Sequence, residues 1–336
     1  MTRRKFVKMA GSALALANIP LAARALYAEN EPPPASFGGP TPNDKFYLTS
    51  FGSTPRVDAS KWSLKIHGLV REPITLSYDA IKAMPQVHET LTLECISNPP
   101  DGWAISNADW VGVKLKPLLE RAGVKTNAVY AAMRGADGYY TGVPVDEIMR
   151  EENFMPYLMN GGPLPPDHGY PLRVFIPGKY GMKQPKWLTE IEFVDHEFTG
   201  YWEARGWSNE AWRKVNSGFF YPRPSSNLLN ILALNRAAQA KAPVDIAGWA
   251  LAGPSGIKRV QVSTDDGKTW HDAALLKNVP YVWTVWKYHF APTRAMTYAI
   301  RVKATAGDGN EQPELDPQTG AGMSAQARMD LKITGI

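Results

Sequence analysis

The sequence predicts two folded units of different class, an α+β domain followed by an all-β sandwich of immunoglobulin type. In the first half, strand-like and helix-like hydrophobic patterns alternate. From about residue 242 onward the chain contains short strand-like runs punctuated by turns and no convincing helix. The two regions of the sequence are separated by a tryptophan-rich stretch and by the linker YPRPSSN, residues 221–227. The 336 residues are enough for a core in each unit.

The first 28 residues have the layout of a twin-arginine export signal. Arg3 and Arg4 precede an apolar run that ends near Ala23, and small residues up to Ala28 provide a cleavage site. The run is short and contains a proline, so it does not predict a membrane-spanning helix. Residues 1–28 therefore predict export of a folded protein to the periplasm.

The charge balance predicts no nucleic-acid partner. The chain has 37 basic and 32 acidic residues, a net charge of +5. Five of the basic residues and none of the acidic ones lie in the signal, so residues 29–336 carry 32 of each sign and no net charge. The basic pI thus reflects the signal alone. No later stretch of the sequence predicts a stable membrane span.

Residues 29–44 form a Pro/Gly-rich leader, and residues 45–224 hold the predicted α+β domain. Helical spacing predicts a short helix within SYDAIKAMP that is ended by Pro85. It predicts a second one within VKLKPLLERAG that is ended by Gly123. Strand patterns occur in five segments: KWSLKIHGLV (61–70), TLTLEC (90–95), NAVYAAMRG (127–135), YPLRVFIPG (170–178) and WLTEIEFVD (187–195).

Residues 225–336 hold the predicted sandwich. Its strand patterns are VDIAGWALAG, KRVQVS, YVWTVWKYHF, TYAIRVKATAGDG and ARMDLKITGI. The DDGK turn between alternating runs predicts a hairpin. Residues 263–270, STDDGKTW, also fit the Asp-box of sialidase-like propellers, but such a fold needs several copies and the sequence has one. Asp and Gly turn chemistry explains the segment more simply.

Cys95, at the end of the TLTLEC pattern, is the one cysteine of the chain. An oxidising compartment favours disulfides, and a single thiol cannot form one within the chain. The residues leave four roles open: an inert buried thiol, an intermolecular bridge, a nucleophile or a metal ligand. The twin-arginine route favours the last, because it exports proteins that fold in the cytoplasm, often around a cofactor.

These pieces together resemble the sulfite oxidase family of molybdopterin-dependent oxidoreductases. The resemblance rests on the export signal, the single cysteine after the TLEC strand, the segment GYPLRVFIPGKYGMKQPKWL and the C-terminal sandwich, in that order. It runs from about Thr41 to the C-terminus. It implies a molybdopterin-binding domain, a C-terminal dimerisation domain and hence a homodimer, and a molybdenum-pyranopterin dithiolene cofactor.

The resemblance implies that Cys95 ligates molybdenum. A thiolate is a soft, strongly donating ligand, and a high-valent metal keeps it deprotonated. Tyr139 matches the place where the family keeps a tyrosine beside the metal, although adjacent Tyr140 leaves the register open by one residue. A packing role is the alternative for either tyrosine. Trp103 and Trp110 are expected to wall the pocket.

The same resemblance assigns the segment PPDHGYPLRVFIPGKYGMKQPKWL to cofactor binding. It implies that His168 and Arg173 contact the pterin or its phosphate, and that Lys183 and Lys186 close over the phosphate. Backbone N–H groups near Gly181 would add donors. A solvated basic loop is the alternative interpretation.

The chain departs from the sulfite-oxidising members of the family, which place arginines around the substrate anion. At three matched places it has Thr49–Phe51, Pro99 with Pro100, and Thr284. Each charge-assisted hydrogen bond to a sulfite dianion is worth about 1.5–3 kcal/mol. We therefore expect sulfite to be a poor substrate, unless Lys287 or Arg134 replaces the missing charge.

The resulting functional prediction is oxygen-atom transfer at molybdenum. The sequence has no CxxCH haem site and no cysteine set for an iron–sulfur cluster, so an external one-electron carrier such as cytochrome c is the expected partner. Reduction of an S-oxide or N-oxide at the same centre is the main alternative. A non-catalytic immunoglobulin-like binding protein, with Cys95 as a core thiol, is a distant one.

Overall fold

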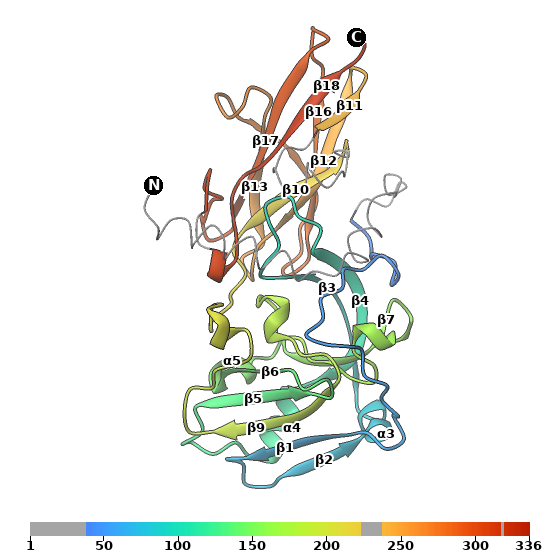
Figure 1. Ribbon diagram of the computed structural model, residues 1–336, viewed down its shortest axis with the longest axis vertical. Helices are drawn as coiled ribbons and strands as arrows, with labels where there is room; N and C mark the ends of the chain where they lie inside the picture. The colour runs from blue at the N-terminus through green and yellow to red at the C-terminus, as the bar shows by residue number, and fades with distance from the viewer. Residues whose placement is uncertain (1–37, 223–236, 317–318) are drawn as a thin grey trace.

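The computed structural model describes residues 38–222, 237–316 and 319–336. The predicted export signal and most of the leader lie outside the described residues. Within these ranges, no helix has the length and apolar character needed to cross a membrane. Figure 1 shows the strands of the C-terminal sandwich at one end of the molecule and the sheet that contains β1 and β9 at the other, with β3 and β4 between them.

The N-terminal half contains two sheets. The first has five strands in the order β2-β1-β9-β5-β6, in which β1 and β9 run parallel and the other neighbours antiparallel. The second has four antiparallel strands in the order β3-β4-β7-β8. The strands are β1 Ser63–Gly68, β2 Ile74–Ser77, β3 Gln86–Glu94, β4 Ile105–Lys114, β5 Tyr130–Gly135, β6 Tyr140–Pro144, β7 Phe154–Met159, β8 Gly162–Pro163 and β9 Leu188–Val194.

Both predicted helices are confirmed, and both are short. Helix α3, Tyr78–Lys82, begins at Ser77, whose hydroxyl accepts a hydrogen bond from the Ala80 N–H as an N-cap. Helix α4, Lys116–Ala122, ends at Gly123, which takes the left-handed conformation that glycine adopts without strain. With the four-residue helix α5, Val145–Ile148, these are the α-helices of the described part. The predicted α+β domain is therefore mostly β.

One predicted strand is wrong. The segment YPLRVFIPG alternates in sequence, and Leu172, Val174 and Ile176 are indeed fully buried. It forms only an isolated bridge, between Phe175 and Phe154, rather than a ladder. Two prolines lack the N–H that a ladder requires, and Gly178 turns the chain with a φ of 92°. The apolar residues alternate because their side chains are buried. The backbone of the segment nevertheless forms a loop, because it is not held in a ladder of hydrogen bonds.

The C-terminal half is a β-sandwich, as predicted. Its sheets run β10-β12-β16-β15 and β11-β18-β17-β13-β14. Trp286 and Ile246 of the first sheet pack with Val260 and Val302 of the second in one core. The strands are β10 Asn216–Tyr221, β11 Ala237–Ala240, β12 Val244–Leu251, β13 Ile257–Ser263, β14 His271–Asp272, β15 Ala274–Lys277, β16 Thr284–Phe290, β17 Thr297–Ala306 and β18 Ala327–Ile333.

Two details of the C-terminal half bear on the predictions. Strands β13 and β14 pair as the predicted hairpin, and Asp265 caps its turn by accepting a hydrogen bond from the Thr269 N–H at 2.8 Å.

Strand β10 precedes the predicted domain boundary at residue 224, yet it pairs with β12 of the C-terminal sheet. The boundary itself stays a prediction.

Candidate functional site

Cys95 follows directly after β3 and opens a tight loop. Its N–H donates to the Ala104 carbonyl at 2.9 Å, and its own carbonyl accepts from the Asn98 N–H at 2.9 Å. The Asn98 side chain closes the loop by accepting from the Ala104 N–H at 2.9 Å. The thiol is half-buried, and its Sγ lies 3.2 Å from the Ser97 hydroxyl. The loop thus presents the sulfur in a fixed place while leaving part of it accessible.

Two buried phenols lie in the electrostatic neighbourhood of the Cys95 sulfur. Burial raises the pKa of Tyr139, and the charges of Glu203 and Cys95 raise it further. Burial also raises the pKa of Tyr47, and the charge of Cys95 adds to the effect. Tyr139 donates its hydroxyl proton to the Met182 carbonyl at 2.6 Å. The geometry favours Tyr139 over Tyr140 for the predicted role beside the metal, which stays a prediction.

Arg173 is a buried cation whose guanidinium is bonded only to neutral groups. It donates to the carbonyls of His168, at 3.1 Å, and Gln184, at 3.4 Å. Its Nε has no hydrogen-bond partner. Aromatic rings cover it, with the guanidinium carbon 4.8 Å from the Phe175 ring and 5.5 Å from the Trp110 ring. Burial lowers the pKa of Arg173 to about 10, which still leaves it charged at neutral pH.

His168 is buried and neutral at physiological pH. Burial lowers the pKa of its imidazole to about 4. Its Nε2 lies 3.1 Å from the Asn43 carbonyl oxygen, which can only accept, so Nε2 carries the proton. Nδ1 is then an acceptor, suited to a donor group on a ligand.

Lys186 is a second cation bonded only to neutral oxygens. Its Nζ donates to the Asp167 carbonyl at 2.9 Å and the Thr49 carbonyl at 3.2 Å. Burial, with the nearby Arg173 charge adding to it, lowers the pKa of Lys186 to about 7. An anion bound between these two cations would restore the pKa of the lysine toward its ordinary range.

Lys183 differs from Lys186 because its ammonium group is already satisfied. The side chain is fully buried, and Nζ donates to Glu203 Oε1 at 2.5 Å, the Gly142 carbonyl at 2.8 Å and Asn209 Oδ1 at 2.9 Å. Three acceptors use all three protons of an ammonium group. The geometry favours an internal structural role for Lys183, and its predicted contact with a phosphate stays a prediction.

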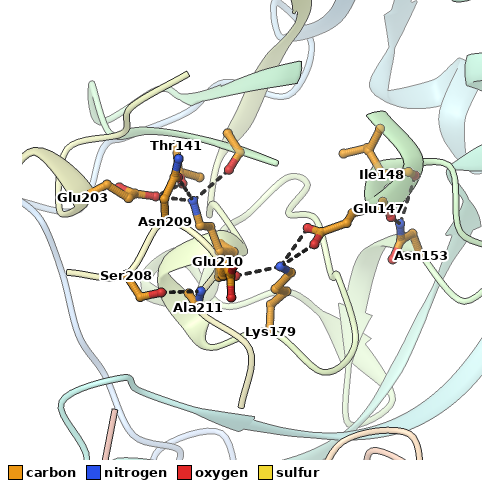
Figure 2. A network of polar contacts seen from close by, with 12 residues as sticks. Thr141, Glu147, Ile148, Asn153, Lys179, Glu203, Ser208, Asn209, Glu210 and Ala211 are labelled. Carbon is orange, nitrogen blue, oxygen red and sulfur yellow. Dashed lines mark hydrogen bonds and ion pairs between the residues drawn. The ribbon is translucent and has the colours of Figure 1, made fainter. Parts of the chain in front are cut away.

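Figure 2 shows the polar network that surrounds this part of the chain, with Glu203, Asn209 and Thr141 on one side and Lys179 with Glu147 on the other. Lys179 is also fully buried, and its Nζ lies 2.9 Å from Glu147 Oε1. It also donates to the backbone carbonyl of residue 210, at 2.6 Å. Both lysines of this region are therefore matched by a carboxylate.

Gly181 begins the short 3-10 helix Gly181–Lys183, whose central carbonyl, that of Met182, holds Tyr139. A Cβ at Gly181 would lie 3.2 Å from the Tyr47 hydroxyl. The absence of a side chain thus lets this helix approach the phenols beside Cys95. The predicted contact of its backbone N–H groups with a phosphate stays a prediction.

Sequence reasoning missed Arg213 and Glu94. Arg213 is buried, and its Nη2 donates to the Lys179 carbonyl at 3.4 Å, while Nε and Nη1 have no partner. Glu94 is buried next to Cys95 with Oε2 unpartnered. Burial lowers the pKa of Arg213 and raises that of Glu94, and each group's charge opposes the shift of the other. Arg213 is a single arginine that follows a tryptophan, and this pattern does not indicate a functional site.

The proposed replacements for the missing arginines are not free. Arg134 is paired with Glu190 at 3.2 Å and with Glu192 at 2.8 Å. Lys287 is exposed and paired with Asp245 at 2.8 Å. Both charges are thus already balanced by carboxylates, and the possibility that either one replaces a missing arginine stays a prediction.

The residues present fit the cofactor implied by the family. Native proteins rarely bury unpaired polar atoms, and here the unpaired Nε of Arg173, the unpaired nitrogens of Arg213 and the unpaired Gln184 Oε1 come from one neighbourhood. Such a set suits an anionic group rich in hydrogen-bonding atoms. Across the described ranges, no cluster of three or more His, Cys, Asp or Glu residues could hold a metal by itself. A single thiolate therefore suits a metal whose other ligands belong to the cofactor.

Comparisons with known proteins agree with this chemistry. Residues 51–202 match the model of the oxidoreductase molybdopterin binding domain, and residues 214–327 match that of the Mo-co oxidoreductase dimerisation domain. The uncharacterized oxidoreductase YuiH of Bacillus subtilis is 35% identical over 175 residues, which are 50% of this chain and 86% of that protein. Sulfite oxidase of Arabidopsis thaliana is 30% identical over 279 residues, 70% of each chain.

Two further matches define the extent of the similarity. The mitochondrial sulfite oxidase of Drosophila melanogaster is 28% identical over 82% of this chain, which spans only 55% of that relative. The crystal structure of the sulfane dehydrogenase SoxCD from Paracoccus pantotrophus superposes with a TM-score of 0.76 at 22% identity, covering 89% of this chain and 82% of that one. At that identity the likeness extends to the fold alone.

Fold, site and family models together define a molybdopterin-dependent oxidoreductase. The chain belongs to the sulfite oxidase family, with a molybdopterin-binding domain followed by a dimerisation domain. It is an enzyme that depends on a molybdenum-molybdopterin cofactor, so the non-catalytic binding protein and the glycosidase are set aside as alternatives.

Proposed function

We propose that the chain is a periplasmic oxidoreductase that transfers an oxygen atom between water and its substrate, passing electrons one at a time to an external cytochrome c. The observation that carries the proposal is a fixed, half-buried Cys95 thiol near the buried Arg173 guanidinium, which hydrogen-bonds only to neutral carbonyls. The periplasmic location rests on the sequence of residues 1–28.

In this proposal each site residue acts on the cofactor or its surroundings. Cys95 ligates the metal, and its loop holds the sulfur in place. Arg173 and Lys186 bind the phosphate, and Nδ1 of neutral His168 accepts a hydrogen bond from the pterin. When bound, the molybdenum cofactor supplies the two-electron redox chemistry. Tyr139 contributes a phenol that stays protonated at neutral pH because burial raises its pKa.

We further propose that the substrate is not sulfite. Phe51, in place of an expected charged residue, lies against Tyr201 at a ring distance of 4.4 Å and near Tyr139 at 5.9 Å. Thr284, at another of the three places, is buried with its hydroxyl 3.0 Å from Asn278 Oδ1. Aromatic lining and a short hydroxyl suit a neutral substrate better than a dianion.

That aromatic lining also supports the second candidate, reduction of a neutral S-oxide or N-oxide. The C-terminal part of the chain matches the Mo-co oxidoreductase dimerisation domain. We propose that this domain, as an immunoglobulin-like sandwich, makes the enzyme a homodimer. Light scattering of the mature protein should give twice the mass of one chain, and a monomeric mass would remove the dimer from the proposal.

Two measurements test the function. Metal analysis of protein purified from the periplasm should find about one molybdenum per chain; folded protein without molybdenum would contradict the proposal. The loaded enzyme is then assayed with sulfite, S-oxides and N-oxides, in both directions, with an artificial one-electron dye and with cytochrome c. Efficient turnover of micromolar sulfite would overturn the substrate proposal, and activity only in the reducing direction would favour the second candidate.

A further inference from the structure

Residues of the C-terminal sandwich hold the chain on both sides of Cys95. Three residues before it, Thr92 accepts a hydrogen bond from the Trp283 N–H at 2.8 Å through its hydroxyl. Its own N–H donates to the Tyr281 carbonyl at 3.1 Å. Six residues after Cys95, the Asp101 carboxylate accepts from the Phe219 N–H at 2.6 Å. The Cys95 loop therefore lies in a segment that is fixed on both sides to the sandwich.

The contact nearest to the thiol is made by Glu94. Its Oε1 accepts two hydrogen bonds, one from Asn98 Nδ2 at 3.0 Å and one from Asn216 Nδ2 at 2.8 Å. Asn98 belongs to the Cys95 loop, whereas Asn216 begins β10 of the sandwich. All three side chains are at most 1% exposed, so water does not compete for these bonds. One carboxylate oxygen thus joins the loop to the C-terminal domain.

The hydrogen-bonded connection from Glu94 through Asn216 continues into the sandwich through a second side-chain amide, that of Gln312. Asn216 Oδ1 accepts from Gln312 Nε2 at 3.1 Å, and Gln312 Nε2 also donates to the Ala325 carbonyl at 3.1 Å. Gln312 Oε1 accepts from the Ser217 hydroxyl at 2.5 Å and from the Ala304 N–H at 2.8 Å. Because every polar position of Gln312 is used, its amide has one orientation, which in turn fixes that of Asn216.

We propose that Glu94 and Asn216 are positioning residues that, supported by Gln312, make the C-terminal domain set the direction of the Cys95 thiol. The relay of Glu94, Asn216 and Gln312 is defined by these contacts. The inference rests on the proposed role of Cys95 as metal ligand and adds that the ligand geometry is shared between the two domains. Without the relay, the segment would keep its backbone closures and the contacts of Thr92 and Asp101 with the sandwich, but it would lose the contact nearest to the thiol. Groups that orient a metal ligand typically change metal affinity or activity by about 10–100-fold when removed.

The experiment uses the molybdenum-loaded full chain and reads the metal–sulfur bond directly. Variants Asn216→Ala and Gln312→Ala interrupt the relay at two depths, so the second serves if the first does not fold. Glu94→Ala removes the acceptor, whereas Glu94→Gln keeps a carbonyl oxygen for both amides. Ser263→Ala is the matched control, because it removes the hydrogen bonds of a buried hydroxyl at the hairpin turn of the same domain.

The readouts are the thiolate-to-metal absorption band, the electron paramagnetic resonance spectrum of the half-reduced metal and the retention of molybdenum during dialysis. We expect Asn216→Ala and Glu94→Ala to shift both spectra and to lose molybdenum about 10–100-fold faster, with Gln312→Ala intermediate and Glu94→Gln nearer the wild type. The control should match the wild type in all three.

Unchanged spectra in all the relay variants, or equal changes in Ser263→Ala, would overturn the inference. Cys95→Ser separates this failure from that of the proposed function. If it loses molybdenum while the relay variants keep wild-type spectra, only the positioning role is wrong. If it retains molybdenum with an unaltered spectrum, the proposed ligand and the inference both fail.

Discussion

Two neighbouring regions of this enzyme bury positive charge in opposite ways. Around Lys183 and Lys179 each ammonium group meets a carboxylate, so the charges are matched inside the protein. Around Arg173 and Lys186 the cations are bonded only to neutral oxygens. A buried charge without a partner is costly, whereas a matched one is maintained by the fold. The comparison favours a structural role for the first region and an anionic ligand for the second.

The comparison assumes that the region around Arg173 and Lys186, called the unmatched region, surrounds a metal-binding thiol. The variant Cys95→Ser tests this assumption and should have the largest effect on metal content and turnover. Serine offers no soft thiolate, so we expect loss of bound molybdenum and a fall in turnover well beyond the roughly 100-fold typical of residues that only orient a ligand. Elemental analysis and steady-state kinetics measure both. Full metal content with normal turnover would remove Cys95 from the site.

Lys183→Met should break the matched region itself. It leaves the Glu203 carboxylate buried without its cation, and breaking one partner of such a pair typically costs about 3–5 kcal/mol. We expect the apoprotein to lose that much free energy of unfolding in urea titrations. The double variant Lys183→Met with Glu203→Gln should recover most of it. If Lys183→Met instead leaves apoprotein stability intact and abolishes cofactor binding, Lys183 belongs to the unmatched region.

Arg173→Met should give the opposite pattern. Removing a buried cation that has no acidic partner should leave the free energy of unfolding of the apoprotein within about 1 kcal/mol of the wild type. Cofactor affinity should fall about 10–100-fold, the equivalent of one charge-assisted hydrogen bond. Reconstitution of the apoprotein with isolated cofactor, followed by metal and pterin analysis, measures the affinity. A large loss of apoprotein stability with normal affinity would contradict the assignment.

Phe51→Arg sharpens the substrate side of the comparison by adding a cation near Tyr139. Phe51 is partly exposed, so an arginine can be accommodated there. We expect kcat/KM for sulfite to rise by about tenfold or more, the equivalent of one charge-assisted hydrogen bond. Phe51→Met is the neutral control and should leave sulfite a poor substrate. Equal activity of the two variants would mean that Phe51 lies away from the substrate.

The smallest expected effect is a pH dependence carried by Lys186. Its pKa is about 7 in the folded apoprotein and about 10.4 in an unfolded chain. Between these values the unfolded state binds more protons, so the stability of the apoprotein should gain from rising pH. Cofactor affinity should fall over the same range, because the lysine loses its charge. Urea unfolding and reconstitution from pH 6 to 9.5 test this, and Lys186→Met should flatten both dependences.

Several elements of this fold could be predicted because local physical chemistry decides them. Strand β1 alternates in sequence because Leu64 and Ile66 face a core, and α4 ends at Gly123 because glycine alone adopts the left-handed turn without strain. The segment 170–178 was different. Its apolar alternation correctly indicated burial, but prolines within it removed the donors of a ladder, and only the tertiary structure made it a loop that carries Arg173.

The sequence by itself determined the class of this enzyme, since motif order identifies a single thiol followed by a basic cofactor segment. It also predicted the members of the candidate site: Cys95, Tyr139, His168, Arg173, Gly181, Lys183 and Lys186. Tertiary structure alone decided which cations are matched, separating Lys183 from Lys186. It also brought Arg213 and Asn216 to Glu94, the residue before Cys95. The reason is physical: pairing of charges depends on distances between segments far apart in the chain, which no local pattern encodes.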